Sequence, residues 1–369
     1  MKVPYNYLPL EFRDSRSIFK DWKKLIKSSD FTLGKYVAKF EKKFASYVGS
    51  KYCISTNNGT DALILALKSV GIGKGDEVIT VSNSFYATTG AIISCNAKPI
   101  LVDCDDRYQI DINQIIKKIN KKTKAILPVH WAGASPDMLK ICQIAKYYKI
   151  KVIEDACMGI GGSLNTKHPG TFGIIGCFSM HPLKSLNVMG DGGMIVTNNK
   201  KIYEWMKKFR NHGMQNRDKI DFWGENIRLQ PLQAIVALNG LKKINRVINL
   251  RNRNAKYLDK KLKQIYPYIV LPSRIKNYKE TFSLYMVLAK KRDELIKYLN
   301  KNGIEAKIHY PIPLHKQKAF TNNYGKIDLN VSEKQAKKLL TLPIHQYLNN
   351  KQLDYMADKI KQFYQPKSS

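Results

Sequence analysis

The chain has 369 residues, of which 44% are hydrophobic and 10% aromatic, and this composition excludes a mainly disordered protein. This length allows one large or two medium-sized domains. The sequence has no apolar run of about 18 residues and no apolar N-terminal core, so we predict no membrane segment and no secretory signal peptide. The net charge of +34 comes from 63 Lys and Arg against 29 Asp and Glu, mostly as spaced lysine pairs on predicted helices, so we expect solvated helix faces and attraction of phosphorylated substrates rather than a nucleic-acid surface.

The six cysteines all lie in the first half of the sequence and form no Cys-x-x-Cys pair. Several stand inside apolar stretches, for example Cys177 between glycine and phenylalanine. This pattern favours buried free thiols in a reducing compartment over a disulfide framework or a zinc site. We therefore expect a cytoplasmic protein that contains no metal.

Short apolar runs alternate with helical patterns from residue 50 to about residue 155. Such alternation is typical of strand–helix units that build a parallel sheet. The predicted strands are 52–55, 77–81, 99–102, 125–129, 151–154, 172–178 and 193–197, and the predicted helices are 60–69, 86–94, 112–119 and 136–148. The sequence therefore predicts an α/β fold with about seven strands in one large domain.

Helical patterns also flank this region on both sides. Apolar residues at helical spacing from Val37 to Val48 predict an amphipathic helix before the first strand. A long helical pattern runs from about 230 to 262, and a smaller α/β unit follows, with strands at 282–288 and 304–309, a helix at 293–302 and a loose tail at 366–369. We therefore divide the chain into a large domain, 1–240, and a small C-terminal α/β domain, 241–369, joined by the long helix.

Three segments carry candidate chemistry, and the first is Asn58-Gly59-Thr60, between a predicted strand and a predicted helix. At such a turn, free backbone N–H groups and the helix dipole face whatever is bound. A phosphate group fits there. Because Gly-Thr is also common as a simple helix cap, this segment alone does not decide between the two roles.

The second segment ends a predicted strand with Asp155, and the third contains Ser179, Lys184 and a glycine-rich turn that opens another strand. Open α/β sheets bind ligands at the carboxyl ends of their strands, although Asp155 can equally cap the following turn. A strand-end carboxylate can stabilise a protonated pyridine nitrogen, and a lysine amine can form a Schiff base with an aldehyde. In this order after the Gly-Thr turn, the residues indicate a pyridoxal phosphate site.

These segments resemble the DegT/StrS-type sugar aminotransferases, a branch of the fold-type I enzymes. The resemblance runs nearly end to end, through FTLG from Phe31, NGTDAL from Asn58, GDEVIT from Gly75, AILPVH from Ala125, IEDAC from Ile153, RNHG from Arg210, NIRLQPLQA from Asn226 and IHYPIPLHKQ from Ile308. It implies an aspartate aminotransferase-like fold with a large, mixed and mostly parallel sheet, pyridoxal 5'-phosphate as cofactor, and transamination as the reaction.

The resemblance also implies roles for single residues. Lys184 would bind the cofactor and then move a proton during the reaction, while Asp155 would keep the pyridine nitrogen protonated. Gly59, Thr60 and Ser179 would hold the phosphate.

Three further positions complete the implied site. Phe85 would stack on the cofactor ring, although a plain core aromatic has the same pattern. Asn226 and Arg228 match family positions that reach into the active site of the neighbouring subunit, Asn226 to the cofactor phosphate and Arg228 to the substrate. The resemblance thus implies a homodimer with shared active sites, unless both residues lie on a solvated loop.

One position departs from the family pattern. Met158 stands where the family usually has Gln or His, which donates a hydrogen bond to the 3′ oxygen of the cofactor, and a thioether cannot donate. The change either leaves an inactive homologue, alters the rate, or is offset by another donor. We expect a working enzyme, because Lys184, Asp155 and Ser179 are all present.

Members of the family act mostly on nucleotide-linked keto sugars with glutamate as amino donor, and a cationic chain suits such anions. The segment with His309 and Tyr310 is more similar to members that aminate a 3-keto sugar than to those acting at C4, and both residues are candidates for substrate contacts, although a structural role fits them too. We expect a dTDP- or UDP-linked 3-keto sugar; the alternatives are a 4-keto-sugar aminotransferase and a non-catalytic regulatory homologue. A sugar dehydratase of this fold is disfavoured, since those enzymes typically carry histidine in place of Lys184.

Overall fold

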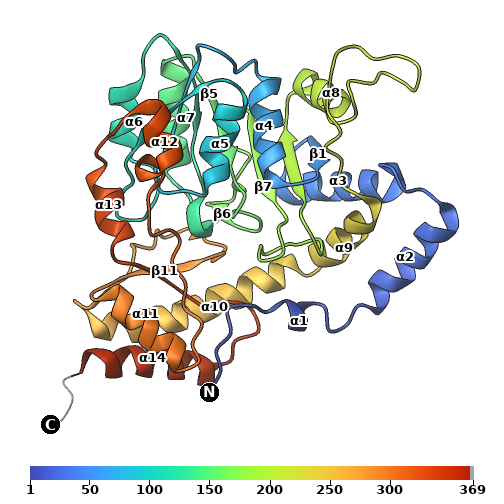
Figure 1. Cartoon of the computed structure of the whole chain (residues 1–369). Coiled ribbons are helices and arrows are strands. Elements are labelled where there is room, and N and C mark those ends of the chain that lie inside the picture. Colours follow the sequence, from blue (N-terminus) through green and yellow to red (C-terminus); the bar gives the residue numbers. More distant parts are fainter. Residues whose placement is uncertain (366–369) are drawn as a thin grey trace.

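A seven-stranded sheet forms the centre of the upper part of the molecule in the computed structural model (Figure 1). The structure describes residues 1–365, so the predicted tail at 366–369 lies outside the described residues. The strands follow the order β1 (Tyr52–Thr56), β8 (Gly193–Thr197), β7 (Ile175–Ser179), β5 (Lys151–Asp155), β4 (Thr123–Leu127), β2 (Glu77–Val81) and β3 (Lys98–Val102). Only β8 runs antiparallel to its neighbours, which confirms the predicted mixed and mostly parallel sheet.

Neighbouring residues of these strands face opposite sides of the sheet and enter different hydrophobic clusters, as Val78 and Ile79 do. One face is covered by α4 (Gly59–Ser69), α5 (Tyr86–Ser94) and α8 (Lys200–Phe209). The other is covered by α3 (Gly34–Val48), α6 (Ile112–Lys118), α7 (Met138–Tyr147) and α9 (Pro231–Leu241). Because both faces are buried, the strands are nearly uninterrupted apolar runs, which is why the sequence predicts them.

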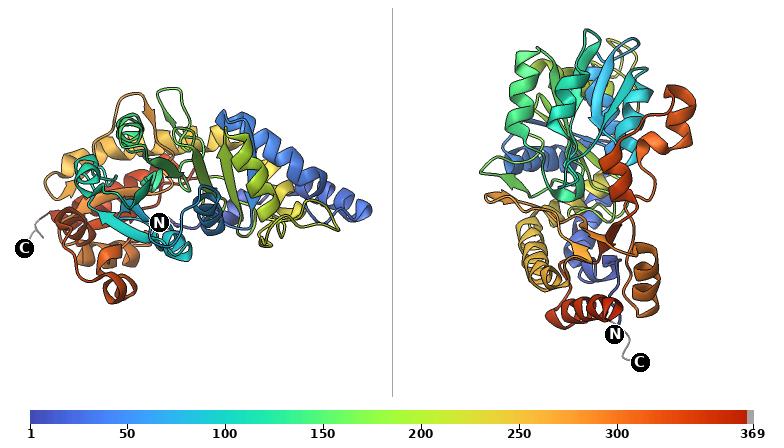
Figure 2. Two further views of the ribbon diagram at one scale, coloured as in Figure 1. Left: turned by 90° about the horizontal axis from the view of Figure 1, so that it is seen from above. Right: turned by 90° about the vertical axis from the view of Figure 1, so that its left-hand side faces the viewer.

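A smaller unit lies below the sheet in Figure 1 and in the right view of Figure 2. Its antiparallel sheet has the order β12-β11-β9. Its elements are α10 (Ile244–Leu262), β9 (Ile269–Val270), β11 (Tyr285–Ala289), α11 (Arg292–Lys301), β12 (Leu339–Leu342) and α14 (Asn350–Tyr364). The other elements are α1 (Leu8–Glu11), α2 (Arg16–Ser28), α12 (Lys318–Tyr324), α13 (Asn330–Ala336) and the short pair β6 (Ser163–Leu164) and β10 (Tyr278–Lys279).

The N-terminal residues before α1 pack with this smaller unit. Val3 is fully buried in its hydrophobic cluster, its N–H donates to the Gly303 carbonyl at 2.8 Å, and its carbonyl accepts from the Glu305 N–H at 3.0 Å. In the opposite direction, Leu314 and Phe320 near α12 pack against Leu101 of the large sheet. The division of the chain at residue 240 stays a prediction, and these contacts show that both ends of the sequence cross between the two units.

The helical pattern from 230 to 262 is two helices rather than one. The α9 helix ends at Leu241 and α10 begins at Ile244. The Lys243 N–H donates to the Gly240 carbonyl at 2.9 Å, a tight turn that closes α9. Glycine has low helix propensity, so its place in the last turn explains the interruption that the apolar periodicity hides.

The strand predicted at 304–309 is wrong. Ile304 forms a single bridge with Val3, and Lys307 forms another with Thr341, so this segment pairs one residue at a time on two different sides. A similar correction applies to the start of the strand predicted at 172–178, since β7 begins only at Ile175. The segment before β7 is held by a side chain instead, because the Phe172 and Gly173 N–H groups both donate to the Glu154 carboxylate at 2.6 Å.

All six cysteines lie within the described residues and are unpaired; Cys142 and Cys157 are half-buried and the other four are buried. Within residues 1–365, no helix combines the length and the apolar character needed to span a bilayer. The same residues contain no cluster of three or more His, Cys, Asp or Glu side chains that could hold a metal ion.

Candidate active site

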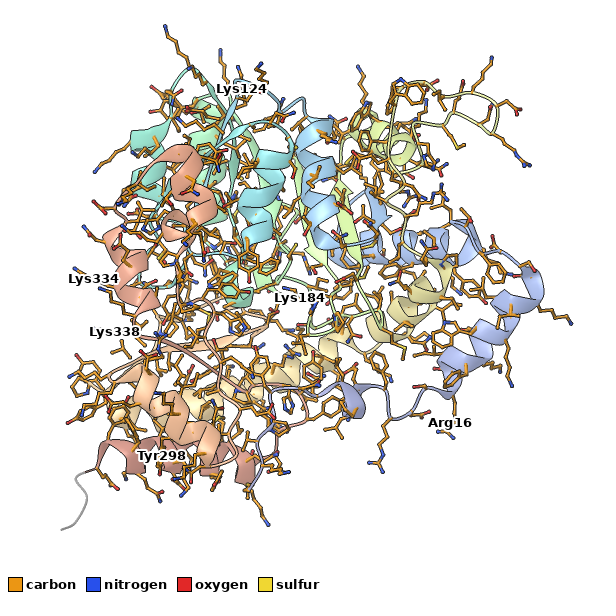
Figure 3. The ribbon with its side chains drawn as sticks, in the orientation of Figure 1. Arg16, Lys124, Lys184, Tyr298, Lys334 and Lys338 are labelled. Atoms are coloured by element: carbon orange, nitrogen blue, oxygen red, sulfur yellow. The ribbon has the colours of Figure 1, made fainter. Side chains whose placement is uncertain are left out.

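A cavity of about 590 Å³ lies where the carboxyl ends of the large sheet face the smaller unit. Figure 3 shows Lys184 at this level, between the upper sheet and the lower unit. The predicted site residues that line the cavity are Gly59, Thr60, Phe85, Asp155, Met158, Ser179, Lys184, His309 and Tyr310. The fold therefore brings together residues that are up to about 250 positions apart in the sequence.

The first turn of α4 forms one wall of the cavity. Asn58 caps this helix, because its side chain accepts from the Asp61 N–H at 2.8 Å. The N–H groups of Gly59 and Thr60 precede the first helical hydrogen bond, so no partner inside the helix takes them. A Cβ on Gly59 would lie 2.8 Å from the Ser179 Cβ, so only glycine lets α4 approach the end of β7 this closely. The cap role expected for Gly-Thr thus belongs to Asn58, and the two N–H groups remain for an anion.

Asp155 ends β5, and its side chain is 4% exposed. One carboxylate oxygen accepts from the Thr88 hydroxyl at 2.7 Å, and the other accepts from the Cys157 N–H at 3.2 Å. The residue therefore caps the following turn, as one reading of the sequence expects. Yet among residues 1–365 no Lys, Arg or His forms an ion pair with it. A buried carboxylate needs such compensation, which a cationic ligand in the cavity would supply.

Lys184 lies on the turn after β7, outside any helix or strand. Burial lowers the pKa of its amine, although the nearby Cys157 and Asp155 act in the opposite direction. Among the described residues that line the cavity, Lys184 is the only Lys or Arg. A lysine with a lowered pKa has more of the neutral form that can act as a nucleophile or accept a proton.

Met158 lies in the cavity wall where the family pattern has a hydrogen-bond donor. Its backbone carbonyl accepts from the Thr281 hydroxyl at 2.6 Å and from the Ser283 hydroxyl at 3.0 Å. These bonds attach the strand-end turn of the large sheet to the smaller unit. The Ser283 hydroxyl also lines the cavity, but its proton is used by the Met158 carbonyl.

Aromatic rings form the wall opposite the sheet. Phe85 is 42% exposed and lines the cavity, so it is not a core aromatic. Tyr310 lies between Phe85 and Trp131, with ring centroids 6.1 Å and 5.9 Å away. Next to it, His309 donates to or accepts from the Thr341 hydroxyl at 3.0 Å, and Tyr5 stacks on its ring at 6.0 Å. Burial lowers the pKa of His309 to about 4, so this ring is neutral at physiological pH.

Asn226 and Arg228 do not line the cavity. Both lie on the segment between α8 and α9, where Asn226 is exposed and Arg228 is half-buried. The buried Arg228 Nε has no hydrogen-bond partner among residues 1–365. Their predicted role in a neighbouring subunit stays a prediction.

Sequence analysis missed several residues that line the cavity; they include Tyr5, Ser84, Thr88, His181 and Asp191. Thr88 is held by the Ser84 hydroxyl at 2.7 Å and fixes Asp155 in turn. Ser84 follows the carboxyl end of β2, so its place after a buried strand was a usable signal. Tyr5 gives no such signal, because it precedes every element of the large sheet.

The residues of the cavity fit pyridoxal phosphate. The uncompensated Asp155 carboxylate suits a protonated pyridine nitrogen, the free N–H groups of Gly59 and Thr60 with the Ser179 hydroxyl suit a phosphate, and the Lys184 amine suits an aldehyde. These groups come from the ends of β5, β7 and β1, which lie close together in the sheet order. The cofactor implied by the sequence thus has matching groups at one cavity.

Comparison with known proteins gives the same family. The DegT/DnrJ/EryC1/StrS aminotransferase family matches residues 13–361. A "pleiotropic regulatory protein" of Geobacillus stearothermophilus is 36% identical over 368 residues, covering 99% of each chain. A dTDP-3-amino-3,6-dideoxy-alpha-D-galactopyranose transaminase of Aneurinibacillus thermoaerophilus is 36% identical over 355 residues, which cover 96% of this chain and 97% of the relative.

A solved structure with bound cofactor PMP, NtdA from Bacillus subtilis, superimposes with a TM-score of 0.92 at 31% identity, covering 98% of this chain and 85% of that one. The sequence match and the shared fold both extend over almost the whole chain. The protein therefore belongs to the DegT/DnrJ/EryC1/StrS aminotransferase family and is a pyridoxal phosphate-dependent aminotransferase.

Proposed function

We propose that this protein transfers the amino group of glutamate to a nucleotide-linked 3-keto sugar, with a dTDP- or UDP-linked sugar as substrate. The observation that carries the proposal is the single cavity that joins Lys184, Asp155 and the start of α4. The identity to a transaminase named for a dTDP-3-amino sugar supports this substrate class.

In this proposal, each group of cavity residues has its own role in binding the cofactor or in moving a proton. When bound, pyridoxal phosphate supplies an electron-accepting ring and a carbonyl carbon that receives the amino group. Asp155, fixed by Thr88, holds the proton on the pyridine nitrogen through a charge-assisted hydrogen bond. The N–H groups of Gly59 and Thr60 and the Ser179 hydroxyl bind the phosphate. Lys184, whose pKa is lowered by burial, would take the proton from the Cα of glutamate and deliver it to the cofactor carbon that receives the amino group. With the keto sugar, the transfer would run in reverse and place a proton on C3.

The second part of the proposal is a homodimer in which each subunit completes the other's site. Glutamate, the nucleotide and the cofactor phosphate are all anionic, while Lys184 is the only Lys or Arg of the described cavity wall. Arg228 is half-buried, and its Nε has no hydrogen-bond partner among residues 1–365. This free donor supports the proposal that the Arg228 guanidinium reaches the active site of the neighbouring subunit. Exposed apolar side chains beside it, Ile220 at 47% and Trp223 at 88%, support a contact surface on this segment. The six unpaired thiols support a cytoplasmic location.

The first test is the two half-reactions, measured separately. The purified holoenzyme is mixed with glutamate, and we expect its visible absorbance band to decrease as the cofactor takes up the amino group. Addition of a dTDP-linked or a UDP-linked 3-keto sugar should restore the band, and NMR of the product should place nitrogen on C3. Nitrogen on C4 would contradict the proposed substrate class.

The control for this experiment is Lys184→Ala. Because this variant lacks the proton-transferring amine, we expect it to turn over no keto sugar while the elution volume and the far-UV spectrum stay unchanged. Appreciable turnover by Lys184→Ala would overturn the role of the lysine.

A non-catalytic regulatory protein, the alternative that Met158 raises, is disfavoured by the membership of the aminotransferase family and by the transaminase relatives. One relative is named as a pleiotropic regulatory protein, and a visible absorbance band that no amino donor changes would be the observation in favour of such a role.

A further inference from the structure

Arg251 is a buried arginine of α10 that none of the chemistry above uses. It is 1% exposed, and its guanidinium donates three hydrogen bonds: Nε to the Gln346 side chain at 3.0 Å, Nη1 to the Phe282 carbonyl at 3.2 Å, and Nη2 to the Tyr7 hydroxyl at 2.8 Å. Among residues 1–365 it forms no ion pair; the nearest carboxylate in this network, Glu11, accepts from the Gln346 amide at 2.7 Å. A buried guanidinium without a carboxylate partner costs stability.

The Tyr7 hydroxyl leads from this arginine to the active site. It donates to the Lys184 carbonyl at 3.1 Å and lies 3.3 Å from the Leu183 carbonyl. Burial raises the pKa of Tyr7, so the hydroxyl keeps the proton that it donates. The ring is fixed on both sides, by the Arg251 guanidinium 5.2 Å from its centroid and by His345 at 5.3 Å. The direction of the hydroxyl is thus set by packing as well as by hydrogen bonds.

Few hydrogen bonds support the backbone that Tyr7 contacts, and one of them, from the Leu183 N–H to the His181 ring, is long at 3.4 Å. Lys184 lies on a turn outside helices and strands, and the turn is closed by its own N–H donating to the His181 carbonyl at 2.8 Å. The hydroxyl of the next residue, Ser185, is buried without a partner among residues 1–365. Small shifts of this turn would move the lysine amine directly, since Lys184 belongs to no strand or helix of the described residues.

The same guanidinium reaches the other wall of the cavity. Phe282, whose carbonyl accepts from Arg251, lies between Thr281 and Ser283, and both of those hydroxyls donate to the Met158 carbonyl. One buried side chain of the smaller unit is therefore linked to both sides of the cavity, through the Phe282 segment on one side and through Tyr7 on the other. On the lysine side, the contact passes through the Tyr7 hydroxyl alone.

We infer that Tyr7, held by Arg251, is a positioning residue that fixes the Lys184 turn and so sets where the lysine amine stands in the cavity. The inference rests on the proposed function of Lys184 as the proton-transferring group. Tyr7 belongs to no motif and does not line the cavity. A misplaced lysine would slow proton transfer without weakening the binding of glutamate.

The test is Tyr7→Phe, which removes one hydroxyl and keeps the ring. We expect the turnover number, measured with glutamate as donor and the 3-keto sugar as acceptor, to fall about tenfold while KM for glutamate stays within about twofold. We also expect a shift in the midpoint of the pH titration of the visible absorbance band of the holoenzyme, since the lysine amine enters a different environment. A merely structural tyrosine would change the melting temperature and neither of these quantities.

The matched control is Tyr347→Phe. Tyr347 belongs to the same aromatic group, 6.2 Å from the Tyr7 ring, but its hydroxyl donates to Glu11 at 3.0 Å and does not reach the lysine turn. It should lose stability as Tyr7→Phe does and keep the wild-type turnover number and titration midpoint. If Tyr7→Phe also keeps both, the inference is wrong.

Two further outcomes separate this inference from the proposed function. If wild-type holoenzyme does not react with glutamate, the proposed function fails, and the titration midpoint still tests the Tyr7 contact. If Tyr7→Phe does not fold, Arg251→Lys serves instead, because an ammonium cannot reach all three acceptors. A lower turnover number at constant KM supports the inference, and an unchanged turnover number overturns it.

Discussion

Met158 departs from the family pattern expected from the sequence, and its side chain and its carbonyl have different surroundings. The side chain lines the cavity, while its carbonyl is fixed by the hydroxyls of Thr281 and Ser283. The backbone of this turn is therefore held independently of the side chain. A substitution at Met158 should therefore change the side-chain group that faces the cavity and keep the hydrogen bonds of the backbone carbonyl.

Met158→Gln should keep or increase the rate of the reaction with glutamate. Glutamine is similar in length to methionine and adds the missing N–H donor, which is worth about 1 kcal/mol as a neutral hydrogen bond. Stopped-flow absorbance of the glutamate half-reaction measures the effect, with Met158→Leu as the control that restores no donor. A large loss in the glutamine variant would mean that the thioether is itself fitted to the cofactor or substrate.

Residue by residue, the sequence identifies the site where a motif marks it and fails where none does. Asp155, Ser179 and Lys184 were predicted because each follows a buried strand in a recognisable order, and all three line one cavity. Tyr5, which lines the cavity, and Tyr7, which contacts the lysine turn, could not be predicted. Both precede the fold's first long helix, and packing of the N-terminal residues on the smaller unit places them. Such contacts depend on tertiary structure and leave no local pattern.

At the scale of elements, the close approach of α4 to the end of β7 shapes the turn at Gly59 and Thr60, where we propose that the phosphate binds. A Cβ at Gly59 would meet the Ser179 Cβ at 2.8 Å and the Cys157 sulfur at 3.2 Å. Both neighbours belong to the cavity wall, and the Ser179 Cβ is attached directly to the backbone of β7, so it cannot rotate away. The contact therefore couples helix packing to cofactor binding.

Gly59→Ala should destabilise the fold by about 1–3 kcal/mol and weaken pyridoxal phosphate binding, because the helix must shift away from β7. Gly90→Ala is the matched control: Gly90 lies inside α5 with open space around its Cβ, so it should gain up to about 1 kcal/mol from helix propensity. Urea unfolding and a cofactor titration measure both quantities. Equal stability of the two variants would contradict this account of the turn.

The elements themselves were predicted best where burial on two faces gives strong apolar runs, as in β2 and β5. The prediction failed where pairing is intermittent, as at 304–309, and where one glycine interrupts a periodic pattern, as at Gly240. The helix α14 shows a different failure, because its signal was present: Asn349 and Gln352 form a capping box before apolar residues at helical spacing. The buried residues Leu353, Met356, Ala357 and Ile360 have the spacing of an amphipathic helix, so α14 was predictable from the sequence.

At the scale of the whole molecule, one buried and two half-buried histidines make stability depend on pH. Burial lowers the pKa of His168, His309 and His345 to about 4 each. The His168 Nε2 accepts from the Gly161 N–H at 2.9 Å, and its Nδ1 donates to the Pro169 carbonyl at 2.6 Å. Protonation of Nε2 would therefore place a second N–H against the Gly161 N–H and break that hydrogen bond. The unfolded chain takes up protons near pH 6.5 and the folded chain only near pH 4, so stability falls as the pH falls through this window.

His168→Gln should reduce this acid loss. Glutamine can accept from Gly161 and does not titrate, so the variant should lose less free energy of unfolding between pH 6.5 and 4 than wild type, by at most about 3 kcal/mol. Urea unfolding at several pH values measures it, with the exposed His212→Gln as control. Identical pH profiles for wild type and His168→Gln would refute the assignment.

The proposed dimer predicts complementation between two inactive variants. If Arg228 acts in the partner's site, a mixed dimer of Lys184→Ala and Arg228→Ala holds one site with both defects and one intact site. Random mixing should then restore about a quarter of the wild-type sites. Activity assays after co-expression measure this, with each variant alone as control. No recovery in mixed dimers of confirmed composition would place Arg228 in its own subunit's site.

The N-terminal residues have a practical consequence for producing the protein. Val3 is buried and forms two hydrogen bonds with residues 303 and 305 of the smaller unit. A few residues further on, Tyr5 lines the cavity and Tyr7 contacts the lysine turn. An affinity tag fused directly before Val3 would crowd these hydrogen bonds and the segment that follows them. If Tyr7 places the Lys184 amine as inferred, a tagged preparation that folds well would still show an altered rate. Recombinant versions intended for kinetics should carry their tag at the carboxyl end, or have an amino-terminal tag removed by a protease before assay.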